Sequence, residues 1–387
     1  MTALPRGFSA YAANLGVKDD TDDFVVVAAA TPVPAAGTFT RSAFAGPSVR
    51  LSRANVADGS ARAVVVVSKN ANVANGADGD ADNQAVVEAV ASRLGCDPSD
   101  ILIASTGVIG RRYPIDRMLE RIESMPPVLD DREIDRPARG IMTTDTVPKI
   151  AERLVGTSGA RIVGMAKGSG MIEPKMATMI AVVLTDAVVE AVTLRDLFSS
   201  AVERTFNCIS VDTDSSTSDT AVVLASGDAG PVDPIEFALA LDAVCLDLAT
   251  QIVRDGEGAE KLIEVRVDRA RYRAQATRVA KAIVNSPLVK TAVHGADPNW
   301  GRVAMAIGKC DGDEDRDIDP ERVTIRFGHQ EMYPVRVSDA DLDSLASYLK
   351  GDEVLIHVSL DTGTESATVY GCDLTDGYIR INADYTT

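Results

Sequence analysis

The residues that could act as nucleophiles have few histidine partners, because the chain contains only His294, His329 and His357. No GxSxG sequence occurs, so a Ser-His-Asp arrangement has little support, although histidine-dependent hydrolysis stays open. A nucleophile that lacks a histidine base can be a threonine whose own α-amino group accepts the hydroxyl proton. That amine suits the task because its unperturbed pKa lies near neutrality.

Thr178 is the candidate for such a nucleophile. Its α-amine becomes free only if the peptide bond between Ala177 and Thr178 is cleaved. Thr178 precedes the apolar run Met179 to Leu184 and follows the glycine- and proline-bearing segment Gly168 to Lys175. A strained turn leading into a rigid strand would hold the hydroxyl against the preceding carbonyl. By pattern alone, an ordinary threonine at the start of a strand is the commoner case, since β-branched residues favour strands.

Other motifs that could bind a cofactor or a metal are weak or missing in the sequence. No GxxxxGK[ST] occurs, and the glycines of Lys167-Gly168-Ser169-Gly170 lack the later glycine of a dinucleotide fingerprint. The five cysteines form no CxxC pair, so neither a disulfide framework nor a zinc site is predicted. No histidine has a partner at the spacing of a metal motif.

The charge of the chain disfavours some partners. With 39 basic and 57 acidic residues, the formal charge of -18 would repel nucleic acid and anionic lipid. It would also oppose an anionic substrate, so such a site needs local cations, for which Lys167 and Lys175 are candidates. No apolar run is long enough to span a bilayer. The first apolar stretch, Phe24 to Ala30, follows an acidic run, so we expect no signal peptide and a cytoplasmic location.

Alternation of β-branched runs with helical patterns predicts an α/β or α+β fold. The predicted strands are Phe24 to Ala29, Ala63 to Ser68, Ile101 to Ala104, Arg161 to Met165, Met179 to Leu184, Ala221 to Ala225 and Leu262 to Val267. The predicted helices, with apolar residues three and four apart, are Asn83 to Leu94, Ile115 to Ser124, Leu194 to Phe206, Pro234 to Arg254 and Arg273 to Val284.

The last part of the chain predicts a smaller β-rich lobe over residues 318–387. Its predicted strands are Arg322 to Phe327, Tyr333 to Val337, Val354 to Leu360 and Ser366 to Tyr370, around one helix, Asp339 to Leu349. The polar segment Asp311 to Asp317 is the best candidate for the boundary.

Several motifs, spread in order along nearly the whole chain, resemble one known family. The longest is Lys167-Gly168-Ser169-Gly170-Met171-Ile172-Glu173-Pro174-Lys175-Met176-Ala177-Thr178-Met179, which resembles the self-cleavage segment of the ornithine acetyltransferases, also called glutamate N-acetyltransferases. The others are Ala104 to Gly110, Met142 to Thr146, Asp212 to Thr220, Asp255 to Ala259, Asn285 to Ala292, Asp297 to Arg302 and Ile381 to Thr387.

This resemblance implies a layered fold like that of the N-terminal-nucleophile hydrolases. It implies an α chain of residues 1–177 and a β chain of residues 178–387, of which 178–310 would share the main layered domain. The cleaved chains would pair as α2β2 or larger. In the family reaction, the acetyl group passes from N2-acetyl-L-ornithine to the threonine and then to L-glutamate. No metal or bound cofactor is implied.

The resemblance also implies roles for single residues. Thr178 would be the nucleophile, and Thr106 and Gly107 would form the oxyanion hole, whose fixed donors lower the barrier. Thr143, Lys167, Thr178, Glu257, Asn382 and Thr387 match substrate-binding positions. A lysine offers a cation to the substrate carboxylate, while a glutamate can hold the amino group of ornithine.

Thr213 and Ser218 depart from the family, which often has glycine and asparagine there. With the stretch from Lys290 to Gly295, they resemble the paralogues encoded beside clavulanic-acid genes, so both the arginine pathway and a specialised pathway stay open. A use of acetyl-CoA as a second donor also stays open. Two other readings remain: a self-processing aminopeptidase or amidase, and an unprocessed, non-catalytic homologue.

Overall fold

The computed structural model describes residues 2–173, 179–310, 312 and 315–384. The chain divides into two compact units. The first comprises described residues within 1–207 and 214–252, and the second described residues within 208–213 and 253–384. Among the described residues, no helix is long and apolar enough to cross a membrane.

An eight-stranded sheet forms the centre of the first unit. Its strand order is β4-β3-β2-β9-β7-β6-β5, with β1 paired to the first half of β2. The strands are β1 (Phe8–Ala13), β2 (Phe24–Phe39), β3 (Ser60–Val67), β4 (Ile101–Ser105), β5 (Lys149–Leu154), β6 (Arg161–Lys167), β7 (Ile180–Val188) and β9 (Thr220–Pro231). Strand β2 is long enough to pair with β3 along its first half and with β9 along its second.

Both faces of this sheet are buried, as the nearly continuous valine run of β3 requires. Val65 and Val67 pack with α2 (Gly76–Leu94) in one core. The intervening Val64 and Val66 belong to a second core, which they share with Met165 of β6. The two ends of the sheet therefore fold over one common core.

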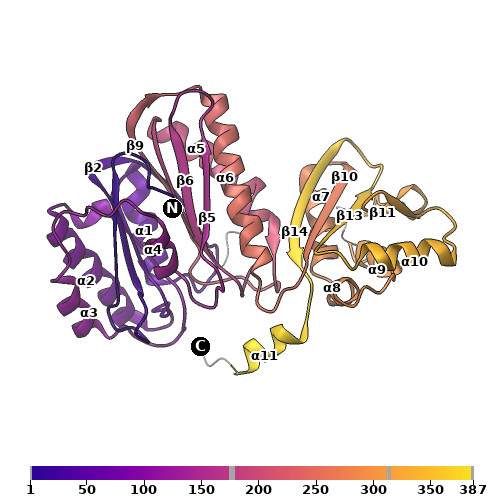
Figure 1. Cartoon of the computed structure of the whole chain (residues 1–387), viewed down its shortest axis with the longest axis horizontal. Helices are drawn as coiled ribbons and strands as arrows, with labels where there is room; N and C mark the ends of the chain where they lie inside the picture. The colour runs from indigo at the N-terminus through magenta and orange to yellow at the C-terminus, as the bar shows by residue number, and fades with distance from the viewer. Residues whose placement is uncertain (1, 174–178, 311, 313–314, 385–387) are drawn as a thin grey trace. The chain divides into compact units, whose positions relative to one another are not determined.

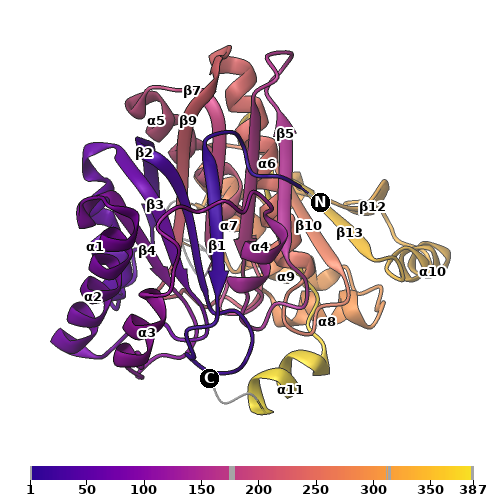
Figure 2. The ribbon, with the colours of Figure 1, turned by 60° about the vertical axis from the view of Figure 1, so that its left-hand side comes forward.

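Helices cover the outer faces of the folded sheet. In the first unit, α2 and α3 (Ile115–Ile122) lie on one outer side and α6 (Pro234–Arg254) on the other (Figure 1). Gly164 of β6 has no room for a side chain because Leu248 of α6 lies 2.8 Å from its Cβ position. Figure 2 shows α1 (Pro47–Asn55) beside α2 at the β4 edge. The remaining helices of this unit are α4 (Asp135–Gly140) and α5 (Ala191–Arg204).

The second unit contains a six-stranded sheet of its own, in the order β12-β11-β13-β10-β14-β8. The strands are β8 (Ile209–Ser210), β10 (Leu262–Ala270), β11 (Thr324–Phe327), β12 (Gln330–Tyr333), β13 (Glu353–Ser359) and β14 (Glu365–Cys372). Strand β10 pairs in parallel with β13 and antiparallel with β14. It therefore lies inside the sheet, where its alternating apolar residues enter one core.

Most helices of the second unit pack on its sheet or on each other, whereas the last helix has no buried residue. They are α7 (Arg273–Val284), α8 (Pro287–His294), α9 (Gly301–Gly308), α10 (Asp339–Tyr348) and α11 (Asp376–Asp384). Figure 1 shows α7 beside β14. Helix α8 begins in a way that its sequence predicts, since Ser286 caps it by accepting from the Val289 N–H and Pro287 follows at the first helical position.

The mixed α/β class expected from the sequence is confirmed, and the long predicted helix Pro234 to Arg254 has the same bounds as α6. Two details differ. The second unit begins at Val253, upstream of the segment 311–317, because β10 pairs with the late strands β13 and β14. The strand predicted at Tyr333 to Val337 lies earlier in the chain, because β12 spans Gln330–Tyr333 and ends where Pro334, which has no N–H, follows.

Candidate functional site

The turn after β4 carries Thr106 and Gly107. Thr106 is buried, and its N–H donates to the Val67 carbonyl at 3.0 Å. Gly107 has φ +126°, and an added Cβ would lie only 2.2 Å from the backbone of Lys69. Only glycine fits this turn. Gly107 is exposed, and within the described part of the chain its N–H donates to no other group.

Lys167 lies beside this turn, at the end of β6. Its side chain is only 4% exposed, and its Nζ donates to Thr106 Oγ1 at 3.1 Å. In the antiparallel pairing of β6 with β7, Lys167 lies opposite Ile180. Ile180 comes two positions after Thr178 in the sequence, so Lys167 and Thr106 lie where the chain resumes after the expected cleavage point.

Asp145 connects the other residues of this region. Its Oδ1 accepts from the Lys149 ammonium and from the Gly168 N–H, both at 2.6 Å, and its Oδ2 accepts from the Thr143 N–H at 3.0 Å. Burial by itself would raise the pKa of Asp145, but Lys167 and Lys149 outweigh it and lower the pKa. One buried carboxylate therefore fixes Thr143 and the start of the segment that follows Lys167.

Asp219 fixes the chain where it resumes after Thr178, as Asp145 fixes it after Lys167. The residue is fully buried, and its Oδ1 accepts from the Met179 N–H at 2.9 Å. Burial raises the pKa of this carboxyl well above its usual range, against smaller opposing effects of Thr40, the Met179 N–H and Lys167. Within the described residues, Oδ2 has no hydrogen-bond partner. Asp219 thus fixes the residue that directly follows Thr178.

Two more of the expected residues meet in the second unit. Asn382 Nδ2, on α11, donates to Glu257 Oε2 at 2.8 Å. Gly258 has φ +71°, and its Cβ position lies 2.3 Å from the Tyr378 nitrogen, so the segment after α6 packs tightly on the start of α11. Glu257, which follows α6 directly in the sequence, and Asn382 on the terminal helix are thereby held together.

The expected site residues therefore form two groups in the described chain. Thr106, Gly107, Thr143 and Lys167 lie together in the first unit, while Glu257 and Asn382 lie together in the second. Ala177, Thr178 and Thr387 lie outside the described residues.

The sequence argument gave Asp145 and Asp219 no role of their own. Both lie in motifs that resemble the family, Asp145 in Met142 to Thr146 and Asp219 in Asp212 to Thr220. Nothing in the sequence distinguishes a buried carboxyl from an exposed one. The signal that could have found Asp219 is its place directly before β9, the strand next to β7.

Comparison with known proteins decides the family. The ArgJ family model matches residues 9–387. The chain belongs to the ArgJ family. This confirms the resemblance on which the sequence argument relied.

Relatives of this ArgJ-family chain match it over its full length. It is 55% identical to "Arginine biosynthesis bifunctional protein ArgJ 2" of Nostoc sp., over 100% of this chain and 99% of that one. It is 54% identical to "Glutamate N-acetyltransferase Oat2" of Streptomyces clavuligerus, over 99% and 98% of the two chains. It is 48% identical to "Arginine biosynthesis bifunctional protein ArgJ" of Rhodococcoides fascians, over 100% and 95%.

Proposed function

We propose that this ArgJ-family chain cleaves itself between Ala177 and Thr178 and then transfers acetyl from N2-acetyl-L-ornithine to L-glutamate through an acetyl-threonine at Thr178. The enzyme class is that of acyltransferases. The observation that carries the proposal is the contact between Lys167 Nζ and Thr106 Oγ1, next to the start of β7.

That contact prepares Thr106 to act as an oxyanion donor. Because the Thr106 oxygen accepts a hydrogen bond from the Lys167 ammonium, its own O–H stays available to donate elsewhere. The ammonium also polarises the hydroxyl, which makes it a stronger donor. The N–H of Gly107, an exposed residue in a turn that only glycine fits, supplies a second donor. Two fixed donors of this kind stabilise the oxyanion of a tetrahedral intermediate.

The acyl transfer then proceeds in two steps, acylation of Thr178 and transfer of the acetyl group to glutamate. Thr178 Oγ attacks the acetyl carbonyl carbon while the Thr178 α-amine takes the hydroxyl proton. The bond from carbon to the ornithine nitrogen breaks, and that nitrogen leaves with the proton. In the second step, the glutamate amine attacks the acetyl-threonine ester and gives a proton to the Thr178 α-amine. The bond from carbon to Thr178 Oγ breaks, and the α-ammonium returns that proton to Thr178 Oγ. Because the base must be unprotonated, turnover is expected to rise with pH through the pKa of that amine.

Residues of opposite charge would bind the two charged groups of the substrate. We assign the substrate carboxylate to Lys167, the one of these residues that offers a cation. We assign the ornithine amino group to Glu257, with Asn382 orienting the Glu257 carboxylate through their 2.8 Å hydrogen bond. Thr143 and Thr387 complete the proposed set. The cleaved α and β chains would assemble as α2β2 or larger.

The decisive assay measures products. The chain is incubated with N-acetylornithine, with and without glutamate, and N-acetylglutamate and acetate are both quantified. We expect N-acetylglutamate only when glutamate is present. Acetate released at the same rate in both tubes would instead establish an amidase that uses water as acceptor. The same panel with acetyl-CoA tests the second donor.

Cleavage is tested separately by intact mass. The wild-type chain is expected to give two fragments that meet at Ala177 and Thr178. Thr178→Ala should remain one chain and lose transfer, whereas Thr178→Ser should retain some of both because it keeps a hydroxyl and an α-amine. A wild-type chain that stays intact after long incubation would indicate the non-catalytic homologue.

A further inference from the structure

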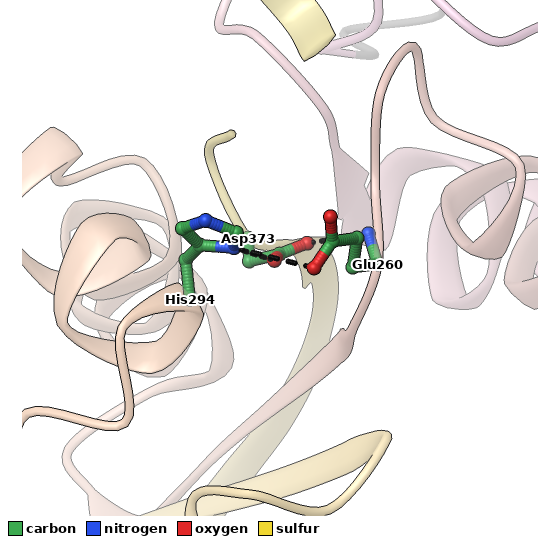
Figure 3. A group of neighbouring side chains, drawn as sticks. All are labelled: Glu260, His294 and Asp373. Carbon is green, nitrogen blue, oxygen red and sulfur yellow. Dashed lines mark hydrogen bonds and ion pairs between the residues drawn. The ribbon is translucent and has the colours of Figure 1, made fainter. Parts of the chain in front are cut away.

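We propose that Glu260, His294 and Asp373 in the second unit form a binding site for a divalent transition-metal ion, with Zn²⁺ as the best match. Among the described residues, this is the group whose ligand atoms converge, all lying within 4.8 Å of one another. Figure 3 shows the three side chains pointing toward a common centre, with His294 facing both carboxylates. The site is independent of the proposed acetyl transfer.

The spacing of the ligand atoms agrees with tetrahedral coordination. His294 Nδ1 lies 3.1 Å from Asp373 Oδ2 and 3.6 Å from Glu260 Oε2. Ligand bonds of about 2.0–2.1 Å at tetrahedral angles place neighbouring ligand atoms about 3.3–3.4 Å apart. The two measured separations bracket that value. The three ligand atoms, which all lie within 4.8 Å of one another, are therefore close to the spacing that a shared ion requires.

Asp373 is held in a fixed orientation, as a metal ligand requires. Its side chain is fully buried, and its Oδ1 accepts from the N–H groups of Glu260 and Lys261, both at 2.9 Å. These two bonds fix the carboxyl plane and leave Oδ2 directed at His294. Hydrogen bonds of this kind, outside the coordination sphere, orient ligands in metal sites. They also tie Glu260, a second ligand, to the first.

Lys261, which follows Glu260, has its ammonium hydrogen-bonded to backbone carbonyls and, among the described residues, to neither ligand carboxylate. Lys261 Nζ donates to the carbonyls of Val293, His294 and Leu349, which hold it at the C-terminal end of α8. The same contacts fix the backbone of His294, the last residue of that helix. Three segments distant in sequence therefore bring their ligands to one point.

The donor set favours a transition metal. One imidazole nitrogen with two carboxylate oxygens suits Zn²⁺ and related ions, whereas Mg²⁺ and Ca²⁺ take oxygen ligands. Glu260 is exposed, so a water can reach the fourth position. The sequence gave no sign of this site because positions 260, 294 and 373 have no motif spacing.

The first test is titration of the reduced, full-length protein with Zn²⁺ by calorimetry. Wild type is expected to bind one equivalent. His294→Ala and Asp373→Asn should weaken binding by at least about 100-fold, since even partners outside the coordination sphere contribute about 10–100-fold to metal affinity. Glu260→Gln changes an exposed side chain, so it tests the site without a risk to folding.

His357→Ala is the matched control. His357 pairs with a single carboxylate, Asp268, at 2.9 Å, and so resembles His294 without the converging third ligand. This variant should bind Zn²⁺ as wild type does. Equal loss of binding in His357→Ala, or unchanged binding in both His294→Ala and Glu260→Gln, would overturn the proposal.

Co²⁺ substitution identifies the ligands. We expect the intense visible absorption of four-coordinate Co²⁺ without a sulfur charge-transfer band, and its loss in His294→Ala. A thiolate band would overturn the assignment by placing the ion on cysteine. Failure of wild type to bind one equivalent of Zn²⁺ or Co²⁺ would also refute the site.

Discussion

A single hydroxyl, that of Thr106, links the catalytic proposal to the structure. We expect Thr106→Val, which keeps the shape and removes the donor, to lower kcat for acetyl transfer by about 10²–10³-fold. The measurement is steady-state kinetics with N-acetylornithine and glutamate. Thr205→Val is the matched control, because it removes another buried hydroxyl. Thr205 directly follows α5, and its hydroxyl donates to the carbonyl of Ala201 in that helix. An unchanged kcat in Thr106→Val would remove Thr106 from the oxyanion hole.

The protonation state of Asp219 gives a second residue-level prediction. Because its folded pKa is raised, stability is fully present below the unfolded pKa of about 3.9 and falls as pH rises through the folded pKa. Asp219→Asn imitates the neutral form. It should keep an acceptor for the Met179 N–H and be relatively more stable than wild type at neutral pH.

Asp219→Ala is the contrasting variant. It leaves the Met179 N–H without its acceptor, so we expect a loss of about 1–3 kcal/mol of unfolding free energy and slower self-cleavage. Denaturant unfolding at several pH values and fragment mass measure the two effects. If Asp219→Asn loses cleavage as completely as Asp219→Ala while remaining folded, the ionisable carboxyl itself takes part in the chemistry, and a purely positional role is wrong.

At the scale of elements, the turn after β4 should tolerate no side chain at Gly107. Gly107 and Gly110 both have positive φ, but only Gly107 meets the backbone of Lys69, whereas nothing lies within 4 Å of the Gly110 Cβ position. Gly110→Ala should cost about 1 kcal/mol for its left-handed conformation. Gly107→Ala should cost clearly more and reduce kcat, because the overlap displaces the turn. Thermal unfolding and kinetics of both variants measure this, and equal effects would contradict the close approach.

At the scale of the molecule, strands from both sides of the expected cut belong to one sheet. β6, which precedes the cut, pairs with β7, which follows it, and β2 pairs with β9. Cleavage therefore removes one peptide bond but leaves the strand ladders and the shared core in place. We expect the two fragments to elute together in native size-exclusion chromatography and to separate only in denaturant. Separate elution without denaturant would contradict the shared sheet.

The sequence by itself determined the family, the mixed α/β class and most elements. The apolar run of β3 and the periodic apolar residues of α6 are local patterns, and such patterns can be recognised in the sequence without knowledge of the fold. Thr178 was identified by its family motif, with chemistry explaining why a threonine could serve. The resemblance also selected Thr106 and Lys167, 61 positions apart, without showing that they touch.

Only the tertiary structure decided which groups meet and which charges are buried. Strand pairing brings Lys167 opposite Ile180, and pairing of β10 with β13 and β14 moves the unit boundary to Val253. Burial raises the pKa of Asp219, whereas Lys167 and Lys149 lower the pKa of Asp145, although the sequence gives both the same side chain. The physical reason is that pKa and ligand geometry depend on neighbours in space, and those neighbours come from distant parts of the chain.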